Sequence, residues 1–399
     1  VVDNVAYANT NWAAAKNATA NYNLACAAVI QYTLIPDVNF EKKLMSLGLD
    51  SGIIDGKVPT AKISGVTSLN VSKSSITNLT GIQDFASLEV LDCSGNSLTT
   101  LDLSKNIALK NLVCYSSQLT ALDVSKNTAL EQLTCYSNQL TTLDVSKNTA
   151  LTYLSCYSNQ LAALDVSKSI ALKKLDCYSN QLTALDVSQN AALTELNCYS
   201  NKLISFDISK SIVLTKLYCY SNQLSALDVS KNIALIELYC YSNQLTALDV
   251  SKNTALRHIN CSSNQLMSLN AMNGRDFSTY NFKNNPNLDC IQVDHIYYYD
   301  NSYKDTVATY SKDCSRVLIP DVNFENKLIA LGIDSGTADG KVLTANIIKV
   351  KILDLGTTII YDLTGLEDFS NLETLYCSGA SNPSGGVTGK LTKLNVTKN

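Results

Sequence analysis

The sequence contains few of the residues that histidine-dependent catalysis requires, since its 399 residues include only 2 histidines. It lacks any run of about 18 apolar residues, so the sequence encodes no helical membrane span. Basic charge is not in excess: 31 Lys and Arg against 35 Asp and Glu give a net charge of −4 and a pI near 5.3. This balance argues against binding to nucleic acid or to an anionic membrane.

Glycine and proline are both absent between Gly95 and Gly274, although they usually mark domain boundaries. Along the same stretch the cysteines recur every 21 residues, which identifies an internal repeat. The column consists of Cys93, Cys114, Cys135, Cys156, Cys177, Cys198, Cys219, Cys240 and Cys261. The stretch is therefore expected to be one uninterrupted solenoid.

Around each cysteine the sequence reads L-x-x-L-x-C-x-x-N-x-L-x-x-L-D-V-S. This pattern resembles the 21-residue bacterial variety of the leucine-rich repeat, from about residue 66 to residue 288. Leu at position 4 and Cys at position 6 alternate with polar residues at positions 3, 5 and 7, which predicts a strand with one buried face. The predicted fold is a leucine-rich-repeat solenoid with a parallel β-sheet on one face, forming a rod or a shallow arc.

The Asn column that follows each strand is predicted to be structural, because amides in a turn can bond the backbone of adjoining coils. Ser117 interrupts it. Its members are Asn96, Asn138, Asn159, Asn180, Asn201, Asn222, Asn243 and Asn264.

A second, longer repeat flanks the solenoid. The sequence IPDVNFE at residues 35–41 returns at residues 319–325, an offset of 284. Asp37 can N-cap a helix with Phe40, Leu44 and Leu47 on one face and Gly48 at its end. This segment and the next repeat resemble an internalin-type N-terminal cap. The predicted units are a remnant of a preceding cap and linker (1–34), an N-terminal cap helix and first repeat (35–87), the solenoid (88–285), a C-terminal cap and linker (286–318), and the start of a second module (319–399).

Four cysteines lie outside the 21-residue ladder, and one of them, Cys377, is the counterpart of Cys93 in the second copy. Cys290 and Cys314 flank a polar, Tyr-rich stretch and are predicted to form a disulfide in the C-terminal cap. Cys26 matches Cys314 in a partial copy of that cap at residues 2–26, and its partner would precede Val1. The chain also begins without a signal-like segment, so we expect a mature or excised piece with a free or intermolecularly paired Cys26.

The other columns yield no metal, cofactor or catalytic site. The nine cysteines are interpreted as buried free thiols rather than a metal ladder, because no ligand set surrounds them. A recurring aspartate column is assigned to aspartate-to-backbone bonds and neutralising lysines, although a calcium-binding column is the alternative. The loop at residues 50–58 lacks the ligand spacing of a calcium loop, and His258 has no activated nucleophile beside it. The aspartates are Asp102, Asp123, Asp144, Asp165, Asp186, Asp207, Asp228 and Asp249.

The candidate binding residues lie on the outward-facing strand positions. Tyrosine occupies position 7 in successive coils, and two more tyrosines at position 5 widen the patch, bordered by charged side chains. Tyrosine is enriched in binding hot spots, but stacked rings could equally serve only to stiffen the repeat. The predicted site comprises Tyr115, Tyr136, Tyr157, Tyr178, Tyr199, Tyr218, Tyr220, Tyr239, Tyr241, Lys216, Glu237, Arg257 and His258.

The resemblance and the tyrosine column together predict a non-enzymatic recognition or adhesion module, secreted or at the cell surface. Its expected partners are an extracellular protein or glycan and adjacent modules of a longer chain, without a cofactor. The alternative is a structural spacer of tandem modules with no ligand of its own. Calcium-dependent adhesion and binding to an ordered surface such as ice are minor variants.

Overall fold

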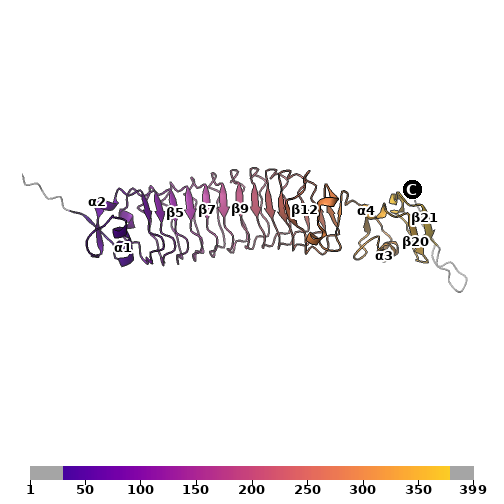
Figure 1. Ribbon diagram of the computed structural model, residues 1–399, viewed down its shortest axis with the longest axis horizontal. Helices are drawn as coiled ribbons and strands as arrows, with labels where there is room; N and C mark the ends of the chain where they lie inside the picture. Colours follow the sequence, from indigo (N-terminus) through magenta and orange to yellow (C-terminus); the bar gives the residue numbers. More distant parts are fainter. Residues whose placement is uncertain (1–29, 378–399) are drawn as a thin grey trace, which may run out of the picture.

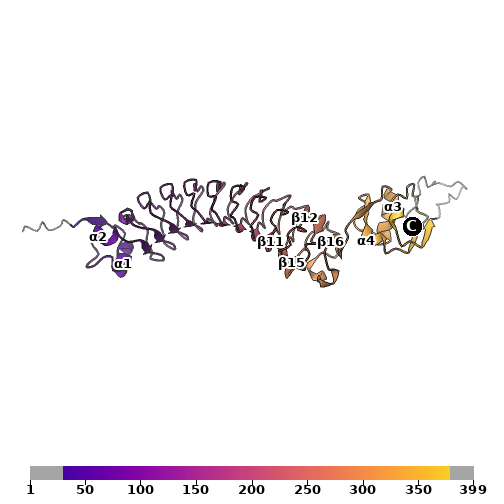
Figure 2. The same cartoon turned by 90° about the horizontal axis from the view of Figure 1, so that it is seen from above.

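Residues 30–377 are described by the computed structural model, and they form an elongated stack of coils (Figure 1). Figure 2 shows that the stack is curved, with β11 (Glu237–Tyr239) and β15 (Thr279–Asn281) on the inner side of the arc. The outer side carries β12 (Ala247–Asp249) and β16 (Cys290–Gln292). The predicted solenoid with a parallel sheet on one face is confirmed.

The inner face is a parallel sheet of 11 strands, one from each coil. Its register is constant, so that Leu217 pairs with Leu238 and Leu133 with Leu154. This constancy places each sequence position in a straight row across the sheet. The remaining strands are β3 (Ser68–Asn70), β4 (Val90–Asp92), β5 (Asn111–Val113), β6 (Gln132–Thr134), β7 (Tyr153–Ser155), β8 (Lys174–Asp176), β9 (Glu195–Asn197), β10 (Lys216–Tyr218) and β13 (His258–Asn260).

A second parallel sheet was not predicted. It joins β12, β14 (Ser268–Asn270), β16 and β17 (Thr309–Ser311) at the C-terminal end of the stack. In its first strand Leu248 is buried between exposed neighbours, which is the alternation of a strand. The same Leu-Asp-Val pattern recurs in earlier coils. Among the described residues, those earlier coils form no strands on this side of the arc.

The core between the two sides is filled by rows of Leu, Val and Cys. All nine ladder cysteines are free, and none has any solvent-exposed surface. Burial raises the pKa of the thiols, to about 12 for Cys93, Cys135, Cys198 and Cys240. The interpretation of this column as buried free thiols is therefore confirmed.

The predicted asparagine column forms a hydrogen-bonded ladder. Asn159 Nδ2 donates to the carbonyls of Cys135 (3.1 Å) and Cys156 (3.0 Å), and its Oδ1 accepts from Leu140 N (3.0 Å). Each amide thus ties its own coil to the preceding one. Ser117 cannot span this distance, and within residues 30–377 its buried Oγ has no hydrogen-bond partner.

A second asparagine ladder, absent from the prediction, lies on the other side of each coil. Asn127 Nδ2 donates to the carbonyls of Leu103 (3.1 Å) and Asn106 (2.9 Å) of the coil before it. Ser169 and Ser211 interrupt this row. The members are Asn106, Asn127, Asn148, Asn190, Asn232 and Asn253.

The N-terminal cap closes the open end of the core. Asp37 Oδ1 accepts from Asn39 N (2.9 Å) and Phe40 N (3.0 Å), which caps the helix, while Oδ2 accepts from Thr77 N (2.8 Å) in the first repeat. The prediction that Leu47 belongs to the apolar face of this helix is wrong. Leu47 is the C-cap residue and 44% exposed, so the apolar face ends one turn earlier. The cap contains β1 (Tyr32–Leu34), α1 (Val38–Ser46), β2 (Lys57–Pro59), α2 (Thr60–Ile63) and η1 (Ile82–Asp84).

The loop at residues 50–58 is held by a protein carboxylate. Glu41 in α1 is fully buried, and its side chain accepts from the backbone N–H of Asp55 (2.8 Å) and Gly56 (3.0 Å). The same contacts recur from Glu325 in the second copy.

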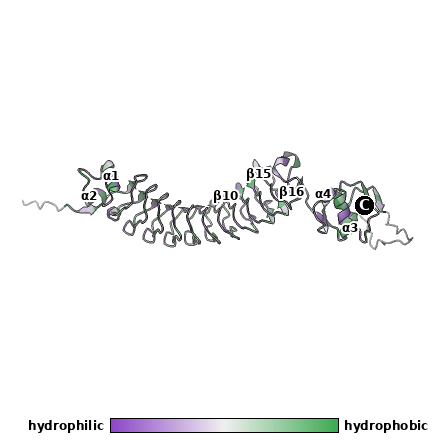
Figure 3. Ribbon diagram, turned by 90° about the horizontal axis from the view of Figure 1, so that it is seen from below, coloured by the Kyte–Doolittle hydropathy of each residue, from purple (hydrophilic) through white to green (hydrophobic). Residues whose placement is uncertain are grey.

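A separate apolar core runs from Ile319 to Phe369. Its helix begins after Asp321, which makes the same capping bonds as Asp37. Figure 3 shows the arc from the opposite side, with the two copies of the helical cap at its two ends. The elements are η2 (Ile296–Tyr298), η3 (Asn301–Tyr303), β18 (Arg316–Leu318), α3 (Val322–Ala330), β19 (Lys341–Leu343), α4 (Thr344–Ile347), β20 (Ile352–Gly356), η4 (Leu366–Asp368) and β21 (Thr374–Cys377).

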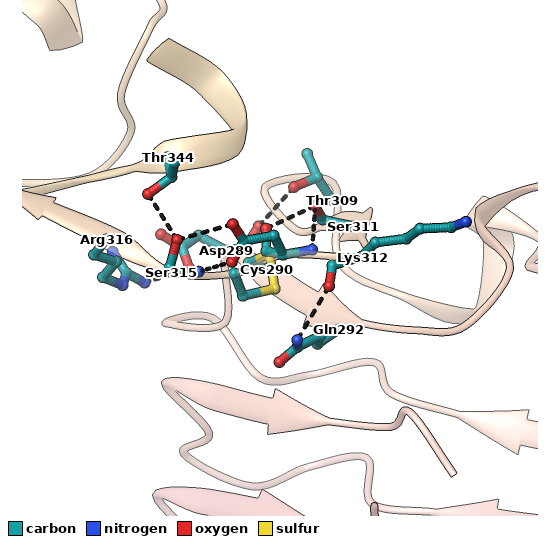
Figure 4. The surroundings of a disulfide bond; sticks show 11 residues. Asp289, Cys290, Gln292, Thr309, Ser311, Lys312, Ser315, Arg316 and Thr344 are labelled. Atoms are coloured by element: carbon teal, nitrogen blue, oxygen red, sulfur yellow. Dashed lines mark hydrogen bonds and ion pairs between the residues drawn. A yellow bond between two sulfur atoms is a disulfide. The ribbon is translucent and has the colours of Figure 1, made fainter. Parts of the chain in front are cut away.

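The predicted cap disulfide is present between Cys290 and Cys314, whose Cα atoms are 5.8 Å apart (Figure 4). Next to it, Arg316 Nη2 lies 2.6 Å from Asp289 Oδ1, and Ser315 Oγ donates to Thr344 Oγ1 at 2.8 Å. The disulfide and the Asp289–Arg316 ion pair therefore connect the C-terminal cap of the solenoid to the segment that leads into β18.

Cys26, the partial cap at residues 2–26 and the last stretch of the predicted second module lie outside the described residues. Among residues 30–377, no helix is long and apolar enough to cross a membrane.

Candidate functional site: a tyrosine-lined groove

The position-7 tyrosines form one continuous stack along the inner face of the arc. Neighbouring ring centroids are 4.1–4.4 Å apart, and neighbouring planes are 7–13° from parallel. This spacing follows from the constant register, because the same position of adjacent parallel strands is about 4.8 Å apart. We call the set the tyrosine column: Tyr115, Tyr136, Tyr157, Tyr178, Tyr199, Tyr220 and Tyr241.

The rings of the tyrosine column are half-buried. Burial raises the pKa of Tyr220 and Tyr241 to about 12, with a further contribution from neighbouring phenols. The hydroxyls are therefore neutral at physiological pH and can both donate and accept hydrogen bonds.

A shallow groove of about 620 Å³ runs along the tyrosine column. Its second wall is formed by Tyr153 and Lys174 at strand position 3, and its floor by Asp176 and Asn197 at position 5. Tyr218 and Tyr239, bulky position-5 residues in β10 and β11, stand at its C-terminal end. The lining residues are Tyr136, Tyr153, Tyr157, Lys174, Asp176, Tyr178, Asn197, Tyr199, Tyr218, Tyr220 and Tyr239.

Hydrogen bonds fix the floor of the groove. Asp176 is 5% exposed and accepts from Tyr153 Oη at 2.9 Å and from Asn197 Nδ2. Asn197 is 7% exposed, and within the described part of the chain its buried Oδ1 accepts no hydrogen bond. The floor is thus a polar surface whose side chains are held in place by hydrogen bonds.

Charges of opposite sign alternate along strand position 3 from β8 to β11. Lys174 Nζ lies 3.0 Å from Glu195 Oε1, and Lys216 Nζ lies 3.0 Å from Glu237 Oε1. Burial opposes ionisation of Glu195, but Asn197 and Lys174 outweigh it and hold the pKa of this carboxyl below its usual value. Lys174 Nζ also lies 3.7 Å from Asp176 Oδ2, so one ammonium serves two carboxylates.

The structure gathers part of the predicted charged border. Tyr218 and Tyr239 stack with centroids 5.1 Å apart, and the hydroxyl of Tyr218 donates to Glu237. His258 is next to Glu237 in the sheet, but its Nδ1 is 2.9 Å from Thr279 Oγ1. Arg257 is exposed and precedes β13. These last two residues lie beyond the groove, which extends from Tyr218 toward β7.

Sequence reasoning missed Tyr153, Asp176 and Asn197. All three lie on outward-facing strand positions where the residue varies from coil to coil, as in Gln132, Thr134 or Asn111. This variation left no repeating pattern that could single them out. The disulfide was found from the cysteines outside the ladder.

The convex aspartate column forms backbone caps. Each carboxylate from Asp102 to Asp249 accepts from the serine N–H two residues later at 2.8–2.9 Å. These bonds lower the pKa of carboxyls such as Asp144 and Asp207. The neighbouring lysines, such as Lys147 and Lys210, lower the pKa of these carboxyls further by their charge, although they form no close ion pair with them within residues 30–377. No cluster of three or more potential metal ligands occurs in that range.

Comparison with known proteins places the fold. No sequence-family model matches the chain, and no curated protein sequence matches it. Among solved structures, it is similar to the functional domain of InlJ from Listeria monocytogenes, which includes a cysteine ladder. The two are 28% identical over 88% of this chain and 72% of that one, with a TM-score of 0.56. A leucine-rich-repeat protein of Leptospira interrogans is 24% identical over 58% of this chain and 67% of that one, with a TM-score of 0.51.

The stacked coils, the buried cysteine ladder and the inner parallel sheet define the class as a leucine-rich-repeat solenoid. Its helical N-terminal cap and its likeness to InlJ make the chain similar to the internalin type of leucine-rich-repeat protein.

Proposed function

We propose that this chain is a non-enzymatic recognition module that binds an extracellular protein or glycan through its tyrosine-lined inner face. The observation that carries the proposal is the groove beside the tyrosine column. A polar floor held by buried hydrogen bonds is not needed to stack coils, since the other coils stack with different residues at these positions. Concave, preorganised surfaces with a few convergent polar groups are typical of binding sites.

A secreted or surface location is part of the proposal. It is supported by the Cys290–Cys314 disulfide, because disulfides persist mainly outside the reducing cytosol. The nine ladder thiols remain reduced in the same molecule because they are buried and un-ionised.

The non-enzymatic character is supported by the geometry of the candidate groups. His258 Nδ1 lies 2.9 Å from the Thr279 hydroxyl, but among the described residues no carboxylate hydrogen-bonds to its ring to orient it as a base. The carboxylate of Asp176 accepts bonds from Tyr153 and Asn197. A general base needs a substrate or nucleophile within hydrogen-bond reach.

A structural spacer is the second candidate, and the ring stacking itself favours it. Face-to-face tyrosines at 4.1–4.4 Å stiffen the sheet whether or not a ligand binds. The repeated cap at an offset of 284 residues fits tandem modules, with residues 286–318 as cap and linker and 319–399 as the start of the next module.

A binding screen separates the two candidates. The chain is tested against arrays of glycans and extracellular-matrix proteins beside a Tyr218→Ala, Tyr239→Ala double variant. A matched double variant, Tyr297→Ala, Tyr298→Ala, removes two cap tyrosines that are 95% and 71% exposed. Binding lost only in the first variant supports recognition, provided its melting temperature is unchanged. Absence of binding to every probe supports the spacer.

A further inference from the structure

Every side chain that lines the groove carries a polar group. Every lining residue is Tyr, Lys, Asp or Asn. Protein interfaces draw most of their affinity from an aromatic or aliphatic anchor that enters a desolvated apolar pocket. This groove offers such an anchor no aliphatic wall, and its floor is a buried carboxylate and a buried amide.

The tyrosine column presents hydroxyls and ring edges to the groove. Each inner ring is covered on both faces by its neighbours; Tyr157, for example, has ring centroids 4.1 Å away on either side. A ligand at this wall therefore meets a row of neutral phenol groups that repeat at the strand spacing.

The charge balance of the floor selects against anions. Lys174 is shared between Asp176 at 3.7 Å and Glu195 at 3.0 Å, so this cluster carries a net charge of −1. An incoming carboxylate or sulfate would face two carboxylates and one occupied ammonium. A neutral ligand meets no such repulsion.

The dimensions fit a single extended chain. Positions 3 and 7 of one strand are about 13 Å apart, which sets the separation of the two walls. From β7 to β10 the floor crosses three strand spacings, about 14 Å in total. A short oligomer can lie along this path, parallel to the axis of the solenoid.

We propose that the groove bounded by Tyr153, Lys174 and the tyrosine column binds a neutral oligosaccharide. Sugar hydroxyls both donate and accept, so they match the acceptors of Asp176, the amide of Asn197 and the phenols. Asn197 lines the groove and donates through Nδ2 to Asp176, which fixes both side chains in the floor. The inference rests on the proposed recognition function and adds the ligand class and the subsite.

The test uses the full chain and three sets of probes. They are neutral hexose and N-acetylhexosamine oligomers, oligosaccharides bearing carboxylate or sulfate, and extracellular proteins stripped of glycans. The strongest hit is then titrated by calorimetry with three variants. Asp176→Asn removes the floor charge, Tyr153→Phe removes one donor to it, and Asp92→Asn is the control at the same strand position in β4, outside the groove.

We expect a neutral oligosaccharide to bind, and Asp176→Asn to weaken it by about tenfold or more, since bonds to a charged group are worth about 1.5–3 kcal/mol. Tyr153→Phe weakens binding less, and Asp92→Asn leaves it unchanged. If Asp176→Asn lowers the melting temperature, sugar binding is compared instead in Tyr153→Phe and Lys174→Gln. Both side chains are half-exposed, so these changes should disturb the fold less.

Three results overturn the proposal in different ways. Neutral sugars that bind equally to all variants place the subsite elsewhere, while the recognition function stands. Binding only to acidic glycans or to deglycosylated proteins replaces the ligand class. Failure of every probe to bind removes the recognition function itself.

Discussion

The rings of Tyr136 and Tyr157 lie face to face, with centroids 4.1 Å apart and planes 9° from parallel. The same relationship continues in both directions along the column, so each interior ring contributes to two stacks. Stacked pairs add about 0.5–1.5 kcal/mol beyond the burial of their area. The column therefore stabilises the sheet in addition to lining the groove.

Replacing one interior ring tests this stabilisation. Tyr157→Phe is expected to change the free energy of unfolding by less than about 0.5 kcal/mol, because both ring contacts remain. Tyr157→Ala is expected to lower it by about 1–3 kcal/mol, because both stacks are lost. Urea unfolding followed by circular dichroism measures the difference. Equal stability of the Phe and Ala variants would show that the stack contributes nothing.

Ser117 marks a gap in the first asparagine ladder that can be filled. Ser117→Asn is expected to raise the free energy of unfolding by about 1 kcal/mol, because the new amide can bond two carbonyls and one N–H as Asn159 does. The converse change, Asn159→Ser, should cost about 1–3 kcal/mol because it leaves buried backbone groups unpaired. A destabilised Ser117→Asn protein would mean that this turn is too narrow for the amide.

The cysteine ladder predicts a loss of stability in alkali. The pKa of each thiol is raised by burial, to about 12 for Cys135 and Cys198, while an unfolded thiol titrates near 8.5. The unfolded state then releases protons first, so stability is complete below about pH 8.5 and falls as pH rises toward the folded pKa. One unit above the unfolded pKa, the loss is about 1.4 kcal/mol per thiol.

Unfolding titrations between pH 7 and pH 11 measure this dependence, and Cys198→Ala serves as the control. That variant loses core packing at all pH values but should show a shallower decline in alkali, because one titrating group is gone. An identical slope in both proteins would exclude the thiols as the cause.

Gly81 is required by a close approach in the N-terminal cap. Its φ is +106°, and an added Cβ would lie 2.6 Å from the carbonyl oxygen of Leu34 and 2.3 Å from Ile35 Cδ1. Gly81→Ala is expected to destabilise the cap by more than about 2 kcal/mol. Gly48→Ala is the control, because its φ is also positive but nothing lies within 4 Å of the added carbon. It should cost only about 1 kcal/mol in thermal or urea unfolding.

The fold was predictable where the chain repeats itself. The cysteine at position 6 and the asparagine after each strand recur in nearly every coil, so their burial and their ladders follow from stacking alone. The repeated I-P-D-V-N-F-E segment likewise predicted that Asp37 caps a helix. Leu47 was assigned wrongly because the helical spacing of apolar residues in the sequence continues past Ser46, where the helix ends.

The groove was less predictable because strand positions 3 and 5 carry no fixed residue. Aspartate also stands at position 5 in β4 (Asp92) and asparagine in β13 (Asn260), so nothing in the sequence marks Asp176 and Asn197 as the pair that meets beside Tyr153. The serines after the tyrosines were also missed. Ser116 and its equivalents adopt positive φ values of 50–54°, which serine rarely does outside a turn that the surrounding coils impose.

Because the register of the inner sheet is constant, the length of the solenoid can change only by whole coils if the rows of side chains are to stay aligned. Adding or deleting one 21-residue coil moves the ends by about 4.8 Å and leaves every row of Leu, Cys and Asn in line. Between β7 and β10 such a change would also lengthen or shorten the groove; outside that interval it would leave the groove intact. The length of the solenoid can therefore change through the gain or loss of whole coils outside β7 to β10 without any change in the groove.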